Sequence, residues 1–240
     1  MKNILISGVS RGLGLQVAQL LLADGHRVLG ISRHTTAELD DLQTQHPDHL
    51  LLHHIDLSDL SQLEDLLQSG LLPKGQPIHG LVNNAAWAYT SLVSGVERQK
   101  LEQQFAVNTL APILLARHAI RNMLLHRVRG SLVHVSSVCA HTGYRGLAMY
   151  AATKGALEAF SKNTAREWGA KGIRSNCIVA GFMETAMSSS LDKEQKARIF
   201  QRTSLKQATD PMAVAQSIQF LLLGPESITG QNLFVDAGTI

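Results

Sequence analysis

Short apolar runs that alternate with longer helical patterns limit the folds open to this chain more than any other feature. The runs typical of strands are Lys2–Ser7, Arg27–Ser32, Leu50–Ile55, Ile78–Val82, Ser131–Ser136, Ile173–Val179 and Asn232–Val235. The expected helices cover Gly12–Ala23, a segment capped by Ser58, about Glu97–Leu125 in two pieces around Pro112, about Met149–Trp168, Thr185–Phe200 and Pro211–Leu222. This alternation predicts an α/β fold with a doubly wound, seven-stranded, mainly parallel sheet and helices on both faces.

Composition narrows the class of protein further. The chain is 45% hydrophobic and 17% charged, which supplies a core and excludes a disordered protein. No polar linker divides it, so we expect residues 1–240 to form a single domain. No apolar run is long enough for a membrane helix, and the strand pattern that begins directly after Met1 leaves no room for a signal peptide. With only two cysteines, Cys139 and Cys177, we expect a cytoplasmic protein.

The eleven histidines do not indicate a metal site. His53 and His54 are adjacent in an expected strand, so they point to opposite faces and cannot bind one ion together. The others lack the spacings of known zinc sites, and we predict no metal.

A glycine-rich turn follows the first expected strand. Gly8, Gly12 and Gly14 have the spacing G-x-x-x-G-x-G, which lets the backbone approach a ligand closely. The next helix begins there, and its free N–H groups suit a pyrophosphate. The candidate cofactor contacts in this turn are Gly8, Ser10, Arg11, Gly12, Leu13 and Gly14. The alternative is a tight connection without a ligand.

The end of the second strand determines which dinucleotide fits. NAD-binding folds usually place an acidic residue there, but this strand ends in Ser32 and Arg33, and the first acid is Glu38. Arg33, with Arg11 on the other side, could bind a 2′-phosphate. We therefore predict NADPH rather than NADH, although both arginines could simply be solvated.

Two further strand ends complete the expected cofactor site. Asp56, followed by Leu57, could accept a hydrogen bond from an adenine amino group or cap the next helix. Asn84, Ala85 and Ala86 would let the chain pass close to a ribose, or form an ordinary polar turn.

A candidate catalytic group lies in the second half of the chain. Tyr150 and Lys154 are four residues apart in a helical pattern and share a face. Ser137 ends the fifth strand, at the carboxyl edge where open α/β sheets bind ligands. A tyrosine could supply a proton to a carbonyl oxygen while a hydride adds to the carbonyl carbon, and a nearby ammonium group would lower the pKa of that tyrosine.

In this order and spacing the motifs resemble the short-chain dehydrogenase/reductase family over essentially the whole chain. The matching pieces are Ser7–Gly14, Asn83–Ala86, Asn108, Ser137, Tyr150–Lys154, Asn176–Thr185 and Thr229–Gln231. Three residues depart from the family pattern: Ser7 stands for Thr, Ala86 for Gly, and Ala180 for Pro. The resemblance implies a Rossmann domain and an oxidoreductase.

The same resemblance implies a role for each matching residue. Tyr150 is the proton donor, Ser137 holds the substrate oxygen, and Lys154 also holds the nicotinamide ribose. Asn108 marks a break in its helix, with a water leading to Lys154. The implied contacts near the nicotinamide are Ile178, Gly181, Met183 and Thr185. Residues 182–200 resemble a substrate lid, with Ser188–Ser190 as its hinge.

Four residues are candidate substrate contacts, each with an alternative in ordinary packing. Trp87, Tyr89, Tyr144 and Met183 could wall an apolar pocket or take part in ordinary packing. His141 could enter the pocket or face solvent.

Within the family the chain is most similar to 3-oxoacyl-(acyl-carrier-protein) reductases of fatty acid biosynthesis. This implies reduction of a 3-oxoacyl thioester by NADPH, acyl carrier protein as partner, and a homotetramer built on the two long helices and the last strand. Arg127, Arg129 and Lys171 are candidate carrier contacts, although they fall toward the amino edge of the sheet. The alternatives are a reductase of free ketones, alcohols or sugar-like metabolites, and a catalytically silent dinucleotide-binding regulator.

Overall fold

The computed structural model describes residues 1–73, 75–185 and 192–240. Within this part of the chain a seven-stranded sheet has the order β3-β2-β1-β4-β5-β6-β7, and every neighbouring pair is parallel. The strands are β1 (Asn3–Ser7), β2 (Arg27–Ser32), β3 (Leu50–His54), β4 (Gly80–Asn83), β5 (Ser131–Ser137), β6 (Arg174–Ala180) and β7 (Asn232–Val235). The predicted fold class is confirmed.

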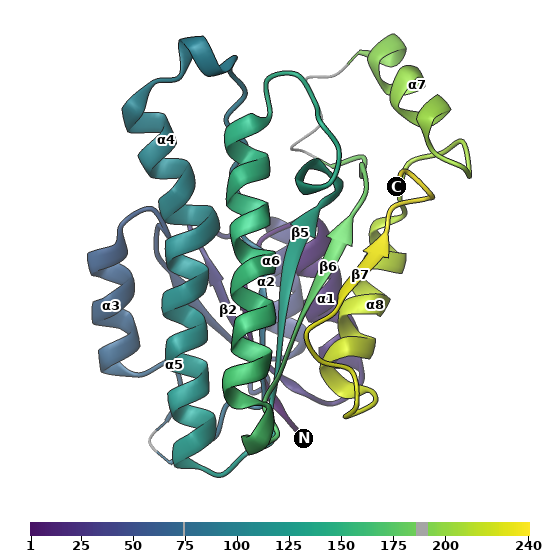
Figure 1. Ribbon diagram of the computed structural model, residues 1–240. Helices are drawn as coiled ribbons and strands as arrows, with labels where there is room; N and C mark the ends of the chain where they lie inside the picture. The colour runs from purple at the N-terminus through teal and green to yellow at the C-terminus, as the bar shows by residue number, and fades with distance from the viewer. Residues whose placement is uncertain (74, 186–191) are drawn as a thin grey trace.

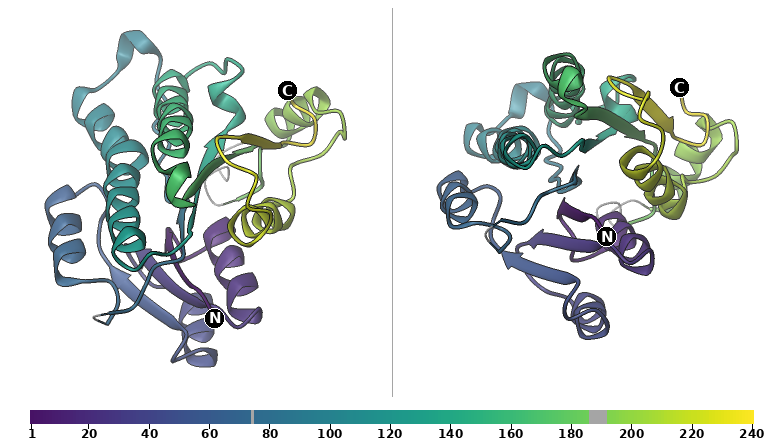
Figure 2. Two further views of the ribbon diagram at one scale, coloured as in Figure 1. Left: turned by 60° about the horizontal axis from the view of Figure 1, so that its bottom comes forward. Right: turned by 90° about the horizontal axis from the view of Figure 1, so that it is seen from below.

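Helices cover both faces of this sheet (Figures 1 and 2). One face carries α1 (Gly12–Ala23), α2 (Ala37–Gln45) and α8 (Pro211–Leu223), and the other carries α3 (Leu60–Ser69), α5 (Ala111–Leu125) and α6 (Ala148–Trp168). Each face has its own apolar core: Ile4, Ile6 and Val133 point into the first, whereas Leu5 and Leu132 point into the second. This alternation is the reason that β1 and β5 are apolar throughout.

The sequence analysis missed one helix and misplaced the start of another. Helix α2 is largely polar and buries only Leu39 and Leu42, so it lacks a strong apolar period. Thr36 starts it by accepting a hydrogen bond from the Leu39 N–H. Helix α3 is capped by Asp59 and not, as expected, by Ser58.

Two other expected boundaries also moved. The long helical stretch breaks at a π-helical turn, η2 (Ala106–Leu110), which joins α4 (Arg98–Phe105) to α5, and Pro112 sits harmlessly in the first turn of α5. The helix expected over Thr185–Phe200 is α7 (Lys193–Arg202), while Ser188–Ser190 lie outside the described residues.

Because all strands are parallel, their carboxyl ends meet at one edge of the sheet, the upper edge in Figure 1. Strand order reverses between β1 and β4, and such a switch point leaves a crevice where open α/β sheets bind ligands. No described helix is long and apolar enough to cross a membrane.

Candidate active site

The glycine turn after β1 leaves no room for side chains at two of its positions. Gly8 has φ +78°, and a Cβ added there would lie 2.9 Å from the Ala85 Cα. A Cβ on Gly14 would overlap the carbonyl oxygen of Gly8 and lie 2.5 Å from the Asn84 Nδ2. Gly12 differs, because it has φ +58° but open space around it. Gly8 and Gly14 therefore let the turn pack closely on itself and on the end of β4, and the open backbone at Gly12 is the part that a pyrophosphate can approach.

One hydroxyl and one amide join this turn to the end of β4. The Ser7 Oγ accepts hydrogen bonds from the N–H groups of Asn84 and Ala85, both at 3.1 Å. In return, the Asn84 Nδ2 donates to the carbonyl oxygens of Ser7 at 3.1 Å and Gly8 at 3.0 Å. Ser7 thus makes these bonds with its own hydroxyl where the family usually has Thr.

Arg33 and Asp56 form one unit at the ends of β2 and β3. The Arg33 Nη1 lies 3.7 Å from the Asp56 Oδ2, and both side chains are about half exposed. The other oxygen of Asp56 accepts from the N–H and the hydroxyl of Ser58, both at 2.8 Å. Burial alone would raise the pKa of Asp56, but the bonds from Ser58 and the Arg33 guanidinium hold that pKa below its ordinary value. Asp56 orders the turn before α3 without capping that helix, and Arg11 is exposed at the start of α1.

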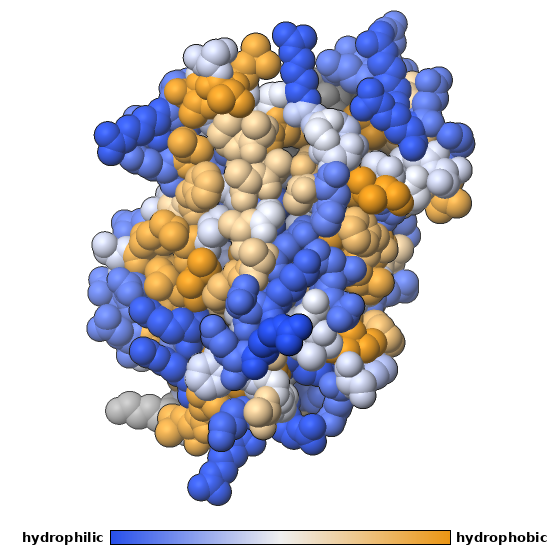
Figure 3. All heavy atoms as spheres, viewed as in Figure 1, coloured by the Kyte–Doolittle hydropathy of each residue, from blue (hydrophilic) through white to orange (hydrophobic). Residues whose placement is uncertain are grey.

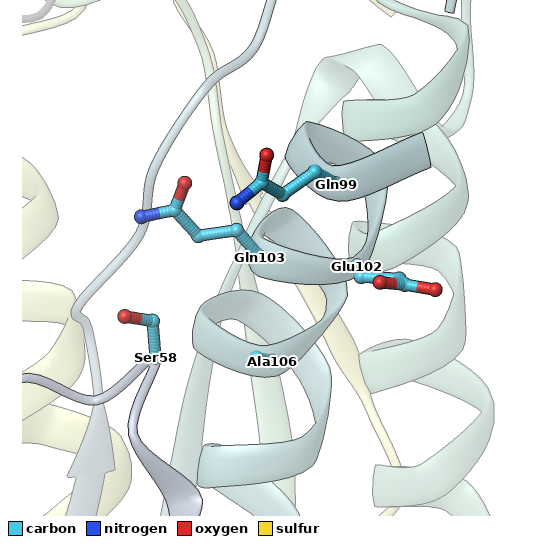
Figure 4. Close-up of a pocket in the computed structure, with 5 residues that line it drawn as sticks. All are labelled: Ser58, Gln99, Glu102, Gln103 and Ala106. Atoms are coloured by element: carbon cyan, nitrogen blue, oxygen red, sulfur yellow. The ribbon is translucent and has the colours of Figure 1, made fainter. Parts of the chain in front are cut away.

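A cavity of about 360 Å³ opens beside this unit (Figure 4). Gln99 and Gln103 of α4 point toward the loop that carries Ser58, whereas Glu102 points away from it. The exposed carboxylate of Glu102 pairs with Arg98. Ser58, which lines the cavity, follows the predicted adenine contacts Asp56 and Leu57 in the chain, and the two glutamines were not among the residues expected from the sequence.

The structure brings Ser137, Tyr150 and Lys154 together where β5 meets α6. A side-chain hydrogen bond joins Ser137 to Tyr150, and the Ser137 Oγ also accepts from the Cys139 N–H at 3.2 Å. The Lys154 Nζ lies 5.6 Å from the centre of the Tyr150 ring and donates to the Val135 carbonyl oxygen at 2.7 Å. Ser137 ends its strand and Tyr150 and Lys154 share a helix face, as expected from their spacing.

The pKa values differ from the expectation that Lys154 lowers the pKa of Tyr150. Burial raises the pKa of the Tyr150 hydroxyl, and the hydrogen bond from Ser137 opposes that rise only in part. Burial likewise lowers the pKa of Lys154 to about 8, since the ammonium group is only 2% exposed. In the protein alone, desolvation is thus the largest cause of both pKa shifts.

Asn108 clamps the loop after β4 to helix α6. Its Oδ1 accepts from the Trp87 N–H at 2.8 Å, and its Nδ2 donates to the Trp87 carbonyl at 2.9 Å and to the Thr153 Oγ1 at 3.1 Å. Asn108 is fully buried within the π-helical turn η2, so the predicted local break is confirmed. A water that leads from it to Lys154 stays a prediction.

The four candidate substrate contacts are half-buried, and they pack against different parts of the protein. Trp87 and Tyr89 stack with their ring centres 6.1 Å apart. Tyr89 also accepts from the Glu97 N–H at 3.3 Å and lies 5.4 Å from the Lys100 Nζ, so it packs against the start of α4. Tyr144 is partly buried, which raises its pKa, and Met183 packs against the apolar core beside α8. Their roles toward a substrate stay predictions.

The described ends of the expected lid contact each other. The Lys196 Nζ donates to the Glu184 carboxylate at 2.8 Å, and the rings of Phe182 and Phe200 lie 6.0 Å apart. Just before them, Gly181 donates to the Val235 carbonyl at 3.0 Å, and a Cβ on Gly181 would lie 2.6 Å from the Asp236 Cα. This close approach requires glycine at position 181. Thr185 is the last described residue before the gap.

His141 contacts a carboxylate and an aromatic ring. Its Nε2 lies 2.9 Å from a carboxylate oxygen of Glu158, and its ring packs edge-on to Phe234 at 4.8 Å. Glu158 is nearly buried, and the sequence analysis missed it although it lies one helical turn after Lys154.

A second buried polar group, His134, was also missed because it looks like part of an apolar strand. Its Nδ1 lies 3.0 Å from the Asn83 Nδ2, and its Nε2 lies 3.3 Å from the Ser175 Oγ. Burial lowers the pKa of His134 to about 4.

The basic residues considered for carrier docking lie at the opposite edge of the sheet. The Arg129 Nη2 pairs with the Glu226 carboxylate at 3.0 Å, and Gly172 packs against the Arg129 side chain. Among the described residues, no group of three or more His, Cys, Asp or Glu could hold a metal ion.

Comparison with known proteins agrees with this geometry. A family model described as "Enoyl-(Acyl carrier protein) reductase" matches residues 8–239. The chain is 30% identical to L-xylulose reductase of Caenorhabditis elegans, covering 99% of this chain and 95% of that protein. It is 31% identical to the 3-oxoacyl-(acyl-carrier-protein) reductase of Chlamydia pneumoniae, covering 99% and 96%. It is also 32% identical to the carbonyl reductase (NADPH) 2 of Sus scrofa, covering 98% and 94%.

Solved structures share the whole architecture. A 4-hydroxyisoleucine dehydrogenase complexed with NADH superposes with a TM-score of 0.92 at 25% identity, covering 100% of this chain and 98% of that one. A short chain dehydrogenase/reductase family protein superposes with a TM-score of 0.85 at 28% identity, covering 99% and 96%.

Proposed function

Because the chain belongs to the short-chain dehydrogenase/reductase family, we propose that it reduces a 3-oxoacyl thioester to the 3-hydroxyacyl product with NADPH. The single observation that carries this proposal is the convergence of Ser137, Tyr150 and Lys154 at the carboxyl edge that also carries the glycine turn. On this view residues 1–240 act as one cofactor-binding and catalytic domain, with residues 182–200 as the substrate lid.

The residues at the carboxyl edge of the sheet suit a bound dinucleotide. Gly12, at the start of α1, has open space around it and suits a pyrophosphate, while Gly8 and Gly14 let the turn pack directly against Asn84 and Ala85. Asn84, Ala85 and Ala86 line the path toward the ribose, and Gly181, Met183 and Thr185 follow on the far side of the switch point. When bound, the cofactor supplies the hydride.

The side chains then handle the substrate oxygen. Ser137 donates a hydrogen bond to the carbonyl and holds it beside Tyr150, which supplies the proton as negative charge develops. A tyrosine with a raised pKa keeps its proton until that oxygen becomes basic. Lys154 has a pKa of about 8, which is near neutral pH, so its amine can both hold and release a proton. Its second role is to bind the ribose hydroxyls.

The preference for NADPH rests on Arg33. Its side chain is about half exposed at the end of β2, so its guanidinium is accessible to a 2′-phosphate there. Gln99 and Gln103 would then lie beside the base. One named relative uses NADPH and one solved structure carries NADH, so the preference depends on this chain's own residues.

The substrate could also be a free ketone. Relatives at the same identity include a xylulose reductase and a carbonyl reductase, and Arg129 is paired with Glu226 at the far edge of the sheet. Carrier docking therefore needs a surface that a neighbouring subunit provides.

We extend the proposal to a cytoplasmic homotetramer. Apolar side chains gather over α5 and α6 and beside β7 (Figure 3). Leu233 and Phe234 of β7 are more than one-third exposed, and Phe220 of α8 is 48% exposed. The long helices α5 and α6 and strand β7 are the elements that the family resemblance implies for assembly, and the exposed Phe220 lies outside them, on α8.

Loss of NADPH absorbance tests the function. The substrates are a 3-oxoacyl group on acyl carrier protein, the same group on a short thiol, and a panel of free ketones and ketoses. We expect the highest kcat/KM with the carrier-bound thioester. Higher kcat/KM with a free ketone would favour the alternative, and cofactor binding without turnover on any carbonyl would favour a regulator.

A further inference from the structure

A buried carboxylate, Glu158, lies one turn of α6 beyond Lys154 and faces the strand that carries Ser137. We infer that Glu158 is a positioning residue that holds the Ser137 segment from both sides, so that the serine hydroxyl meets the substrate oxygen. This inference rests on the proposed reductase function.

Three side chains donate hydrogen bonds to the two oxygens of Glu158. The Ser136 hydroxyl donates at 2.5 Å, the Asn232 Nδ2 donates at 2.6 Å, and the His141 Nε2 lies 2.9 Å from one oxygen and 3.0 Å from the other. The carboxylate is only 9% exposed, so these donors replace the water that it loses.

The donors lie on both sides of the proposed catalytic serine. Ser136 directly precedes Ser137 at the end of β5. His141 follows the short helical turn Val138–Ala140, whose Cys139 N–H donates to the Ser137 Oγ. A single anchor on α6 therefore holds the chain before and after Ser137, and that helix also carries Tyr150 and Lys154.

The third donor adds strand β7 to the same anchor. Asn232 begins β7, and Phe234, two residues later, packs on the His141 ring. The pairing of β7 with β6 places Asn232 and Phe234 against Glu158 and His141, and so holds the loop that follows Ser137. Three side chains from separate segments thus converge on Glu158, and of these only Ser136 is adjacent to a proposed catalytic residue in the chain.

A neutral amide cannot replace this carboxylate. Glu158→Gln keeps the volume but puts an NH₂ group where one oxygen accepted, so at least one donor loses its partner inside the protein. The segment around Ser137 would then relax, while the glycine turn and the Arg33–Asp56 pair, on other strands, would not. Turnover should fall with little change in cofactor affinity.

The test compares Glu158→Gln with Glu167→Gln, an exposed glutamate on the same helix. We expect kcat to fall by about 10-fold or more in Glu158→Gln, with the Kd for NADPH within about 2-fold of the parent protein, and no change in Glu167→Gln. Because Glu158 acts through Ser137, its substitution should have little further effect in a Ser137→Ala background.

Additive effects in the double variant would overturn the inference, and so would a parent-like kcat in Glu158→Gln. If Glu158→Gln does not fold, Ser136→Ala and His141→Phe remove one donor each, and each should lower kcat without changing the Kd for NADPH. Parent-like kcat in both would overturn the inference equally. Absence of turnover by the parent protein on every carbonyl would instead overturn the proposed function, and this inference with it.

Discussion

The two halves of the proposed site are built by different means. The cofactor half, around Gly8, Gly14 and Asn84, is shaped by backbone that excludes side chains and by one serine hydroxyl. The catalytic half is shaped by buried polar side chains, with Lys154 and Glu158 as its charged members. In the first half, side chains at Gly8 and Gly14 would collide with neighbouring backbone or side-chain atoms, whereas the second half depends on particular functional groups.

The largest expected effect is on the catalytic half. Tyr150→Phe removes the proton donor and keeps the ring, so we expect kcat to fall by about 1,000-fold or more, which corresponds to about 4 kcal/mol in the barrier. The Kd for NADPH should change by less than about 3-fold. Steady-state rates and fluorescence titration of the same samples measure both. Retention of more than about one-tenth of kcat would contradict the assigned role.

The matching change in the cofactor half is Gly14→Ala. The added methyl group overlaps the Gly8 carbonyl, so the turn must shift and NADPH affinity should fall by about 100-fold. Gly155→Ala is the control, since it adds the same methyl beside Lys154 into open space within a helix. Titration with NADPH measures both variants. Equal Kd values in the two variants would remove the distinction between the halves.

A buried histidine makes stability in the catalytic half depend on pH. The pKa of His134 falls from 6.5 in the unfolded chain to about 4 in the folded one. Between these values the unfolded state binds more protons, so stability is lost as pH falls. We expect the free energy of unfolding to drop by about 2 kcal/mol between about pH 7 and pH 5.

Urea denaturation at the two pH values measures this drop. His134→Gln should abolish most of it, because that side chain has no proton to gain. An unchanged pH dependence in His134→Gln would assign the effect to other groups.

The smallest expected effect concerns the rim of the cofactor half. Arg33→Ala should lower kcat/KM for NADPH by about 10-fold and leave kcat/KM for NADH within about 2-fold, because one phosphate loses one guanidinium. Initial rates with both cofactors give the ratio. A similar loss with both would mean that Arg33 supports the turn through Asp56 rather than the phosphate.

The sequence predicted the cofactor half better than the catalytic half for a physical reason. Gly8 and Gly14 lie in one short segment, so their spacing alone indicates a tight turn, although Asn84 and Ala85, which also require glycine there, come from a distant part of the chain. Tyr150 and Lys154 share a helix face, which periodicity also predicts. Glu158 and His134 could not be predicted because their partners lie on strands far along the chain. Helix α2 could not be predicted because it buries only two leucines.

The raised pKa of Tyr150 could not be predicted either, since it depends on burial that only the packed structure shows. Equally, the sequence placed Arg33 and Asp56 in separate roles, whereas the fold brings them into contact.

The most direct test of the account follows a labelled hydride. The parent protein is incubated with a 3-oxoacyl thioester and NADPH that carries deuterium at the transferable position of its nicotinamide, and the product is analysed by mass spectrometry. The account predicts a 3-hydroxyacyl product with one deuterium on the carbinol carbon, formed by the parent protein and not by Tyr150→Phe. Absence of reduced product, or product without the label, would contradict it.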